Sequence, residues 1–126
     1  MPKIAIIDDD PDIVDAVSMV LQSKGYQVVA AGNVESGLEL IEKENPDLLI
    51  LDVMMDEPDD GFYLAVKMRK NGMKKPIIML TSVSKATGMT FGTSDSVPVD
   101  EFLEKPVSPG ILLDKVEYYL THPEGR

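Results

Sequence analysis

Residues 3–10 read KIAIIDDD, and this stretch indicates how the chain folds. Its apolar part, 4–7, lacks the polar alternation of a half-exposed strand. A strand tolerates such continuous apolarity when the sheet is covered on both faces, which is typical of parallel sheets. The three aspartates that follow would stand at the end of this strand, where open α/β sheets bind their ligands. The stretch therefore predicts a buried parallel strand that ends in acidic residues.

Further apolar runs along the chain have the length of strands, and several of them also end in polar residues. They lie at 28–30, 48–51, 77–80 and 101–103. Because the carboxyl ends of parallel strands share one edge of a sheet, we expect the polar residues that follow them to converge there. These residues are Asp8, Asp9, Asp10, Asp52, Thr81, Ser82 and Lys105.

Between the apolar runs lie stretches with apolar residues at helical spacing. These stretches contain or begin at Ile13, Val34, Gly61 and Leu112. Asn33 precedes the stretch of Val34 and is a candidate for its N-cap. The last stretch follows Ser108 and Pro109, a cap and a proline suited to a first turn. Strands that alternate with helices predict an α/β fold, a doubly wound five-stranded parallel sheet with helices on both faces.

Residues 84–100 do not fit this alternation well. They read SKATGMTFGTSDSVPVD, where the architecture requires a helix between the fourth and fifth strands. Glycine, Ser, Thr and Pro98 give the segment poor helix propensity. We expect the fourth helix to be short or distorted, or replaced by a loop.

Length, charge and composition limit the classes of function. The 126 residues suit one domain, which we place at 1–121, with a C-terminal tail at 122–126 that includes His122. A formal charge of −10 argues against direct nucleic-acid binding, and the chain has no cysteine for a disulfide or a thiolate metal site. No apolar run approaches the roughly 20 residues of a membrane span, and no signal segment is recognisable. We therefore expect a cytoplasmic protein.

The carboxylates of Asp8, Asp9 and Asp52 would crowd one pocket. At about 4 Å and an effective dielectric constant of about 20, each like-charge pair costs roughly 4 kcal/mol, so the cluster requires a cation or protonation. Oxygen ligands favour Mg²⁺, which can exchange a bound water for a phosphoryl oxygen. Lys105 and Thr81 could then bind the remaining phosphoryl oxygens. A carboxylate can also attack phosphorus, so Asp52 is a candidate nucleophile.

Four segments of the chain resemble the signatures of one known family. The segments IIDDDPDIV, PDLLILDVMM, PIIMLTS and FLEKPV look like those of the response-regulator receiver domain of two-component signalling. The resemblance covers about 2–120 and implies a flavodoxin-like fold. It implies a switch phosphorylated by a histidine kinase or a phosphotransfer protein, which acts on a downstream protein. A receiver catalyses only its own phosphorylation and slow dephosphorylation, so we expect no enzyme in the ordinary sense.

The resemblance also assigns roles to individual residues. Asp8 and Asp9 would hold Mg²⁺ with Asp52 and the Met54 backbone carbonyl, and Asp52 would be the phosphoacceptor. Thr81 would be the switch hydroxyl, Lys105 the phosphate-binding lysine and Phe102 the switch aromatic. The family further implies a cis peptide between Lys105 and Pro106.

The sequence departs from the family pattern in two places. Asp56 stands where the family usually has proline, and the loop 56–61, DEPDDG, carries one extra residue. The second departure is the segment 84–100, where the family has a helix that carries much of the partner-binding face. Met54 and Val83 stand where receivers orient or exclude water behind phosphorus. Because both are apolar, we expect a long-lived phosphorylated state.

Two other interpretations of these residues fail, and a third remains open. A calcium loop over 56–67 would need a ligand at Pro58 and a glutamate at Lys67. An aspartyl phosphatase usually carries a second acid where this chain has Met54. A pseudo-receiver, which binds proteins and switches without phosphate, is the main alternative. Asp10 and Asp12 flank Pro11 and are expected mainly to cap a helix, whereas Phe102 suits a plain core role equally well.

Overall fold

The computed structural model describes residues 2–53, 55, 60–81 and 99–122. Within these residues the chain forms five strands and four helices, which alternate as far as the fourth strand. The strands are β1 (Lys3–Ile7), β2 (Gln27–Ala31), β3 (Leu48–Asp52), β4 (Ile77–Thr81) and β5 (Glu101–Glu104). The helices are α1 (Pro11–Gln22), α2 (Val34–Glu44), α3 (Asp60–Lys70) and α4 (Pro109–Thr121).

The strands form one parallel sheet in the order β2-β1-β3-β4-β5. The chain first moves from β1 outward to β2, then crosses back over β1 to β3 and continues to β4 and β5. The strand order therefore reverses between β1 and β3, and such a reversal leaves a crevice beyond the carboxyl ends of the two strands. The sheet predicted from the sequence is confirmed.

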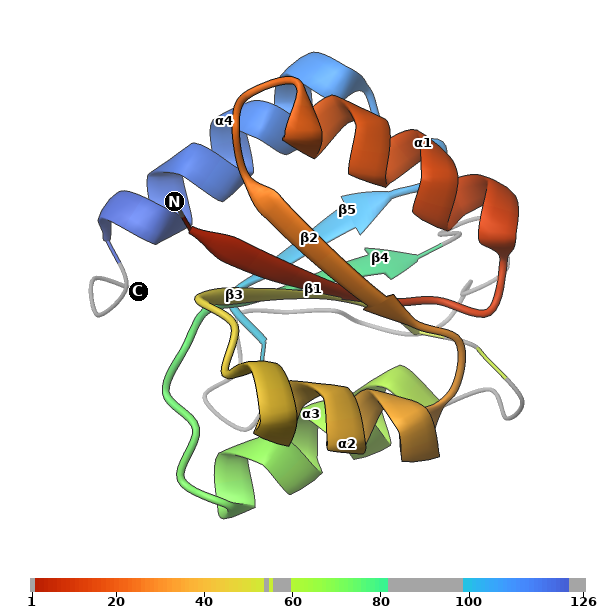
Figure 1. The fold of residues 1–126 in the computed structure, drawn as a ribbon, viewed down its shortest axis with the longest axis vertical. Coiled ribbons are helices and arrows are strands. Elements are labelled where there is room, and N and C mark those ends of the chain that lie inside the picture. The colour runs from red at the N-terminus through yellow and green to blue at the C-terminus, as the bar shows by residue number, and fades with distance from the viewer. Residues whose placement is uncertain (1, 54, 56–59, 82–98, 123–126) are drawn as a thin grey trace.

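Helices cover both faces of the sheet, α1 and α4 on one side and α2 and α3 on the other (Figure 1). Because side chains alternate along a strand, each strand supplies both cores. On one face, Ile4, Ile6 and Ile50 pack with Val17 of α1 and Val116 of α4. On the other face, the intervening strand residues pack with Ile41 of α2 and with Leu64, Ala65 and Met68 of α3. The apolar runs without polar alternation thus reflect a sheet that is buried on both faces.

The helix starts agree with the capping residues of the sequence. Asp10 caps α1 by accepting a hydrogen bond from the Asp12 backbone, Asn33 caps α2 and Ser108 caps α4. The capping role expected for Asp10 is confirmed, and Asp12 lies in the first turn of α1, where an acid favours the helix dipole. The first helix ends at Gln22, and Gly25, with φ of 87°, lies in the turn that leads into β2.

Two further expectations concern segments that the structure describes only in small part. The predicted short or distorted fourth helix at 84–100 lies almost entirely outside the described residues, as does most of the loop 56–61. The domain limits 1–121 and 122–126 stay a prediction. None of the helices in the described ranges is both long and apolar enough to cross a bilayer.

Candidate functional site

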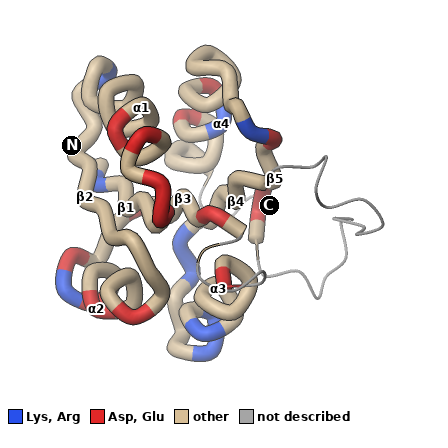
Figure 2. The backbone as a smooth tube through the Cα atoms, turned by 90° about the vertical axis from the view of Figure 1, so that its right-hand side faces the viewer, with Lys and Arg blue, Asp and Glu red and all other residues tan. Residues whose placement is uncertain are grey.

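The polar residues predicted to converge lie at the carboxyl edge of the sheet. Asp8 directly follows β1, Asp52 ends β3, Thr81 ends β4 and Lys105 directly follows β5. In Figure 2 the acidic stretch that leads from β1 into α1 lies at this edge of the sheet. Because β1 and β3 are neighbours in the sheet, residues 44 positions apart in the chain become adjacent.

Three carboxylates form a compact group. Asp8, Asp9 and Asp52 each offer a carboxylate oxygen, and these oxygens all lie within 4.8 Å of one another. Asp8 and Asp52 are almost fully buried, with 2% and 7% of their surface exposed, whereas Asp9 is exposed. Two hydrogen bonds to backbone groups position Asp8. Its N–H donates to the Ala31 carbonyl, and its Oδ1 accepts from the Asp10 N–H.

A single ammonium group lies between the two buried carboxylates. The Lys105 Nζ is 3.1 Å from Asp52 Oδ1 and 3.2 Å from Asp8 Oδ2. The Lys105 N–H donates to the Thr81 carbonyl, which holds the lysine beside the end of β4. The peptide between Lys105 and Pro106 is cis, as the resemblance implied.

The charges of this group shift its protonation equilibria. Burial, and after it the charge of Asp8, raises the pKa of Asp52 to about 6, although Lys105 opposes the shift. Burial alone would lower the pKa of Lys105, but the hydrogen bond that its ammonium donates to Asp52 and the charges of both aspartates raise it. Lys105 therefore stays charged. Ionising Asp52 costs free energy, because the folded site favours its protonated form.

Thr81 and Phe102, the two residues predicted to act as the switch, lie at the end of β4 and in β5. Thr81 is buried, and its Cα is in register with Glu104, the residue before Lys105. The Phe102 ring is half-buried and packs against the core on the α2 and α3 side, with its centroid 6.0 Å from that of Phe62. This packing fits a core residue and a switch equally well.

Sequence reasoning missed the importance of Gly61, in the first turn of α3. A Cβ on this residue would overlap the Asp52 carbonyl oxygen, so only glycine allows the helix to approach the phosphoacceptor candidate this closely. The Asp60-Gly61 pair at a predicted helix start was the available signal. Met54, Val83 and residues 56–59, on which other predictions depended, lie outside the described residues.

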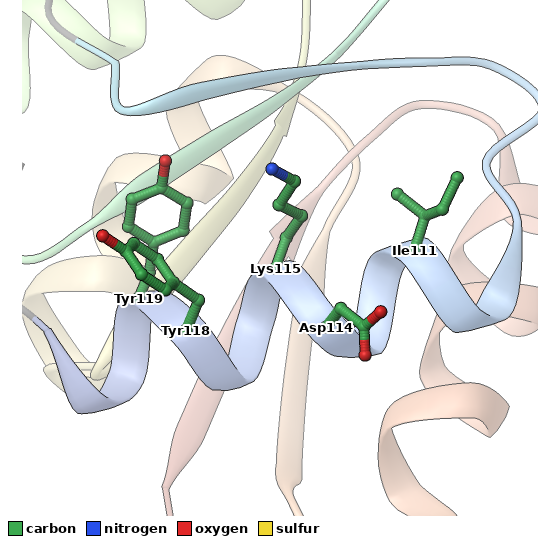
Figure 3. Close-up of a pocket in the computed structure, with 5 residues that line it drawn as sticks. All are labelled: Ile111, Asp114, Lys115, Tyr118 and Tyr119. Carbon is green, nitrogen blue, oxygen red and sulfur yellow. The ribbon is translucent and has the colours of Figure 1, made fainter.

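A pocket elsewhere on the surface contains none of these residues. It measures about 530 Å³ and is lined by five residues of α4, namely Ile111, Asp114, Lys115, Tyr118 and Tyr119 (Figure 3). Lys115 also forms an ion pair with Glu101. The pocket lacks the buried carboxylates that make the sheet edge chemically distinctive, so we assign the candidate site to that edge.

The carboxylates and the lysine can bind ligands of both signs. The oxygens of Asp8, Asp9 and Asp52 suit a hard cation such as Mg²⁺, and the Lys105 ammonium suits an anion. An anionic group carried next to a cation could therefore lie beside both. Phosphoryl groups have this property, and Asp52 supplies a carboxylate that could attack them.

Comparisons with known proteins show the family to which the fold belongs. The family model of the response regulator receiver domain matches residues 4–117. The alkaline phosphatase synthesis transcriptional regulatory protein PhoP of Bacillus subtilis is 32% identical over 97% of this chain and 50% of its own length. An uncharacterized 14.6 kDa protein of Leptolyngbya boryana is 35% identical over 92% of this chain and 88% of its own length. The chain thus spans about half the length of several curated regulators that it matches.

Solved structures show the same architecture. The receiver domain of the Francisella response regulator 1452 superposes with a TM-score of 0.83 at 25% identity, over 98% of this chain and all of that one. TrrA of Thermotoga maritima, a response regulator solved in complex with Mg²⁺-BeF, gives a TM-score of 0.79 at 31% identity, over 94% and 98% of the two chains. With a family model that matches nearly its whole length, the chain belongs to the response regulator receiver domains of two-component systems.

Proposed function

We propose that this receiver domain accepts a phosphoryl group on Asp52 in a Mg²⁺-dependent reaction, and that phosphorylation switches its binding to a downstream protein. One observation carries the proposal. Two buried carboxylates contact the same ammonium group, and a third carboxylate lies within 4.8 Å, so the site holds more negative than positive charge. A cation that completed this arrangement would offset the cost of burying its excess negative charge.

The donor set fits magnesium. Asp8, Asp9 and Asp52 offer oxygen ligands, which Mg²⁺ prefers, and the exposed position of Asp9 leaves room for water in the remaining coordination sites. The family pattern adds the Met54 backbone carbonyl. The complex of TrrA with Mg²⁺-BeF supports the same assignment. When bound, Mg²⁺ would neutralise charge on the transferring phosphoryl group.

The residues of the chain would divide the reaction between them. An Asp52 carboxylate oxygen attacks phosphorus, and the bond from phosphorus to the donor nitrogen of a phosphohistidine breaks. The electron pair stays on that nitrogen, which takes up a proton from solvent. Lys105, already 3.1 Å from Asp52, is placed to bind an oxygen of the transferred group and to compensate its charge. The Lys105 ammonium would keep its contact with Asp8.

The switch would involve the ends of β4 and β5. Thr81 stands at the end of β4, and a phosphoryl group on Asp52 would offer its hydroxyl a new acceptor. Phe102 is paired with Met79 of β4 and lies on the same edge strand that leads to Lys105. A histidine kinase or a phosphotransfer protein would be the donor, and the downstream partner would be a protein, because the formal charge of −10 disfavours nucleic acid.

The alternative is a pseudo-receiver that binds proteins without being phosphorylated. The retained set of Asp8, Asp9, Asp52, Thr81 and Lys105 weighs against it, since a domain freed from phosphoryl chemistry has no need to bury two carboxylates beside one lysine. The two functions differ in one measurable property, which is covalent labelling of Asp52.

Intact-mass measurement after incubation with acetyl phosphate tests the proposal. The chain should gain about 80 Da, one phosphoryl group, in the presence of Mg²⁺ but not with EDTA. Asp52→Asn should abolish the gain, and Asp9→Asn should shift it to higher Mg²⁺ concentrations. Asp12→Asn is the matched control, because Asp12 is an exposed acid in the first turn of α1, and it should be labelled like the wild type.

Equal labelling of the Asp52→Asn variant would contradict the assignment of the phosphoacceptor. No labelling of the wild type by acetyl phosphate or by a phosphorylated histidine donor would favour the pseudo-receiver.

A further inference from the structure

The first turn of α3 lies against the main chain of Asp52. The Gly61 N–H donates to the Val53 carbonyl at 2.8 Å. A Cβ on Gly61 would overlap the Asp52 carbonyl oxygen and would lie only 2.8 Å from the Val53 Cα. These neighbours are backbone atoms, which cannot turn away as the end of a flexible side chain can.

Both sides of this contact are tied to the rest of the fold. On the strand side, the Cα of Asp52 is in register with Leu80, and the Val53 N–H donates to the Leu80 carbonyl at 3.1 Å. The β3 end therefore cannot retreat without disturbing its pairing with β4.

On the helix side, the side chains of α3 are anchored from its third residue, Phe62, onward. The Phe62 ring lies 6.0 Å from that of Phe102 with an interplanar angle of 46°, and Leu64 and Ala65 are fully buried in the core. An added methyl group at Gly61 must therefore displace either the Asp52 peptide or this anchored turn.

We propose that Gly61 and Phe62 are positioning residues for phosphoryl transfer: they fix the main chain of Asp52 and thereby the place of its carboxylate beside Lys105. The inference rests on the proposed function. Neither residue needs to touch the phosphoryl donor, because a nucleophile displaced by about 1 Å can lose about a hundredfold in rate. Phe62 acts by pressing the first turn of α3 onto the strand end through its contact with Phe102.

The test compares two glycines of buried helix faces. Gly61→Ala places a methyl group against the Asp52 backbone, whereas Gly37→Ala in α2 places one 3.0 Å from the Cγ2 of Ile7, the end of a side chain. Both changes raise helix propensity equally. Labelling rates with acetyl phosphate are measured as a function of Mg²⁺ concentration, at a temperature where circular dichroism shows each variant folded.

Gly61→Ala should lower the limiting labelling rate about tenfold, and the half-saturating Mg²⁺ concentration should change by less than about threefold. Gly37→Ala should stay within about twofold of the wild type in both quantities. A purely structural role of Gly61 would leave the limiting rate of the folded protein unchanged, which separates the two explanations.

Phe62→Leu is the second variant, which removes the ring contact with Phe102 but leaves Gly61 in place. It should slow labelling about threefold, and it decides the question if Gly61→Ala does not fold. A folded Gly61→Ala variant labelled within twofold of the wild type would overturn the inference alone, as would equal slowing by Gly37→Ala. If Gly61→Ala does not fold, an unchanged rate in Phe62→Leu would overturn it. A wild type that is not labelled at all would overturn the proposed function and this inference with it.

Discussion

The two edges of the sheet both bury carboxylates, but they neutralise them differently. At the amino edge, Asp100 Oδ2 accepts from the Ile77 N–H at 2.8 Å and from Arg69 at 3.2 Å, with 1% of its side chain exposed. At the carboxyl edge, Asp8 and Asp52 contact the same Lys105 ammonium, and Asp9 lies close by. Among the described residues, the first edge pairs the Asp100 carboxylate with the Arg69 guanidinium, and the second gathers more acids than Lys105 can neutralise.

The difference separates a structural ion pair from a binding site. The Arg69 guanidinium also donates to the carbonyls of Met73 and Lys75, so this network joins α3, the loop before β4 and the start of β5. Its satisfied hydrogen bonds are those expected of a pair that stabilises a fold. The carboxyl edge holds an excess of negative charge, so a ligand that supplies positive charge would stabilise it.

The largest effect is expected from Asp100→Asn. The substitution keeps the size of the side chain but removes the negative charge that Asp100 places beside Arg69, which is mostly buried. We expect the free energy of unfolding to fall by about 3 kcal/mol, as for other broken buried ion pairs. Urea unfolding measures it, and Asp15→Asn on the exposed side of α1 is the control, with a change within about 0.5 kcal/mol. A loss as small as that of the control would show that the amino edge does not depend on this pair.

The pH dependence of stability should distinguish the edges next. Because the folded pKa of Asp52 is raised from 3.8 to about 6, the folded state holds the proton more tightly than the unfolded state. Stability from this group is therefore present below about pH 4 and is lost as the pH rises through about 6. Between about pH 5 and pH 7.5 the metal-free wild type should lose about 1 to 2 kcal/mol relative to Asp52→Asn. A difference between the two proteins that does not change with pH would contradict the shifted pKa.

A smaller effect of opposite sign is expected for Asp52→Asn itself. Without divalent cations at neutral pH, the variant should be more stable than the wild type by about 1 kcal/mol, because a buried carboxylate is removed while Lys105 keeps Asp8. Urea unfolding in EDTA measures the difference. The same aspartate-to-asparagine change would then destabilise one edge and stabilise the other. Destabilisation at both edges would mean that the carboxyl edge is an ordinary ion-pair network.

The sheet and most of the candidate site could be predicted from the sequence, because they follow from patterns among residues that are near one another in the chain. Apolar runs without alternation identify doubly buried strands, and the shared edge of parallel strands then brings Asp8, Asp52, Thr81 and Lys105 together. Helix starts at Asn33 and Ser108 followed from side chains that satisfy free N–H groups nearby.

Features that depend on tertiary contact were not predictable in this way. The approach of Gly61 to the Asp52 backbone depends on how α3 packs against β3, which no local pattern specifies. The Arg69 and Asp100 pair joins residues 31 positions apart at the opposite edge. Strand ends were also predicted a residue short at Asp52 and Thr81, because backbone pairing with β4 and β5 continues into these polar residues.

The dependence of unfolding free energy on Mg²⁺ concentration tests the central claim most directly. If Asp8, Asp9 and Asp52 form a site for one cation, Mg²⁺ should stabilise the wild type by about 1.4 kcal/mol for each tenfold increase above its dissociation constant. The Asp100→Asn variant should keep this slope, and Asp52→Asn should show its onset at higher concentration. A wild type whose stability does not rise with Mg²⁺, or rises equally with NaCl of the same ionic strength, would contradict the account.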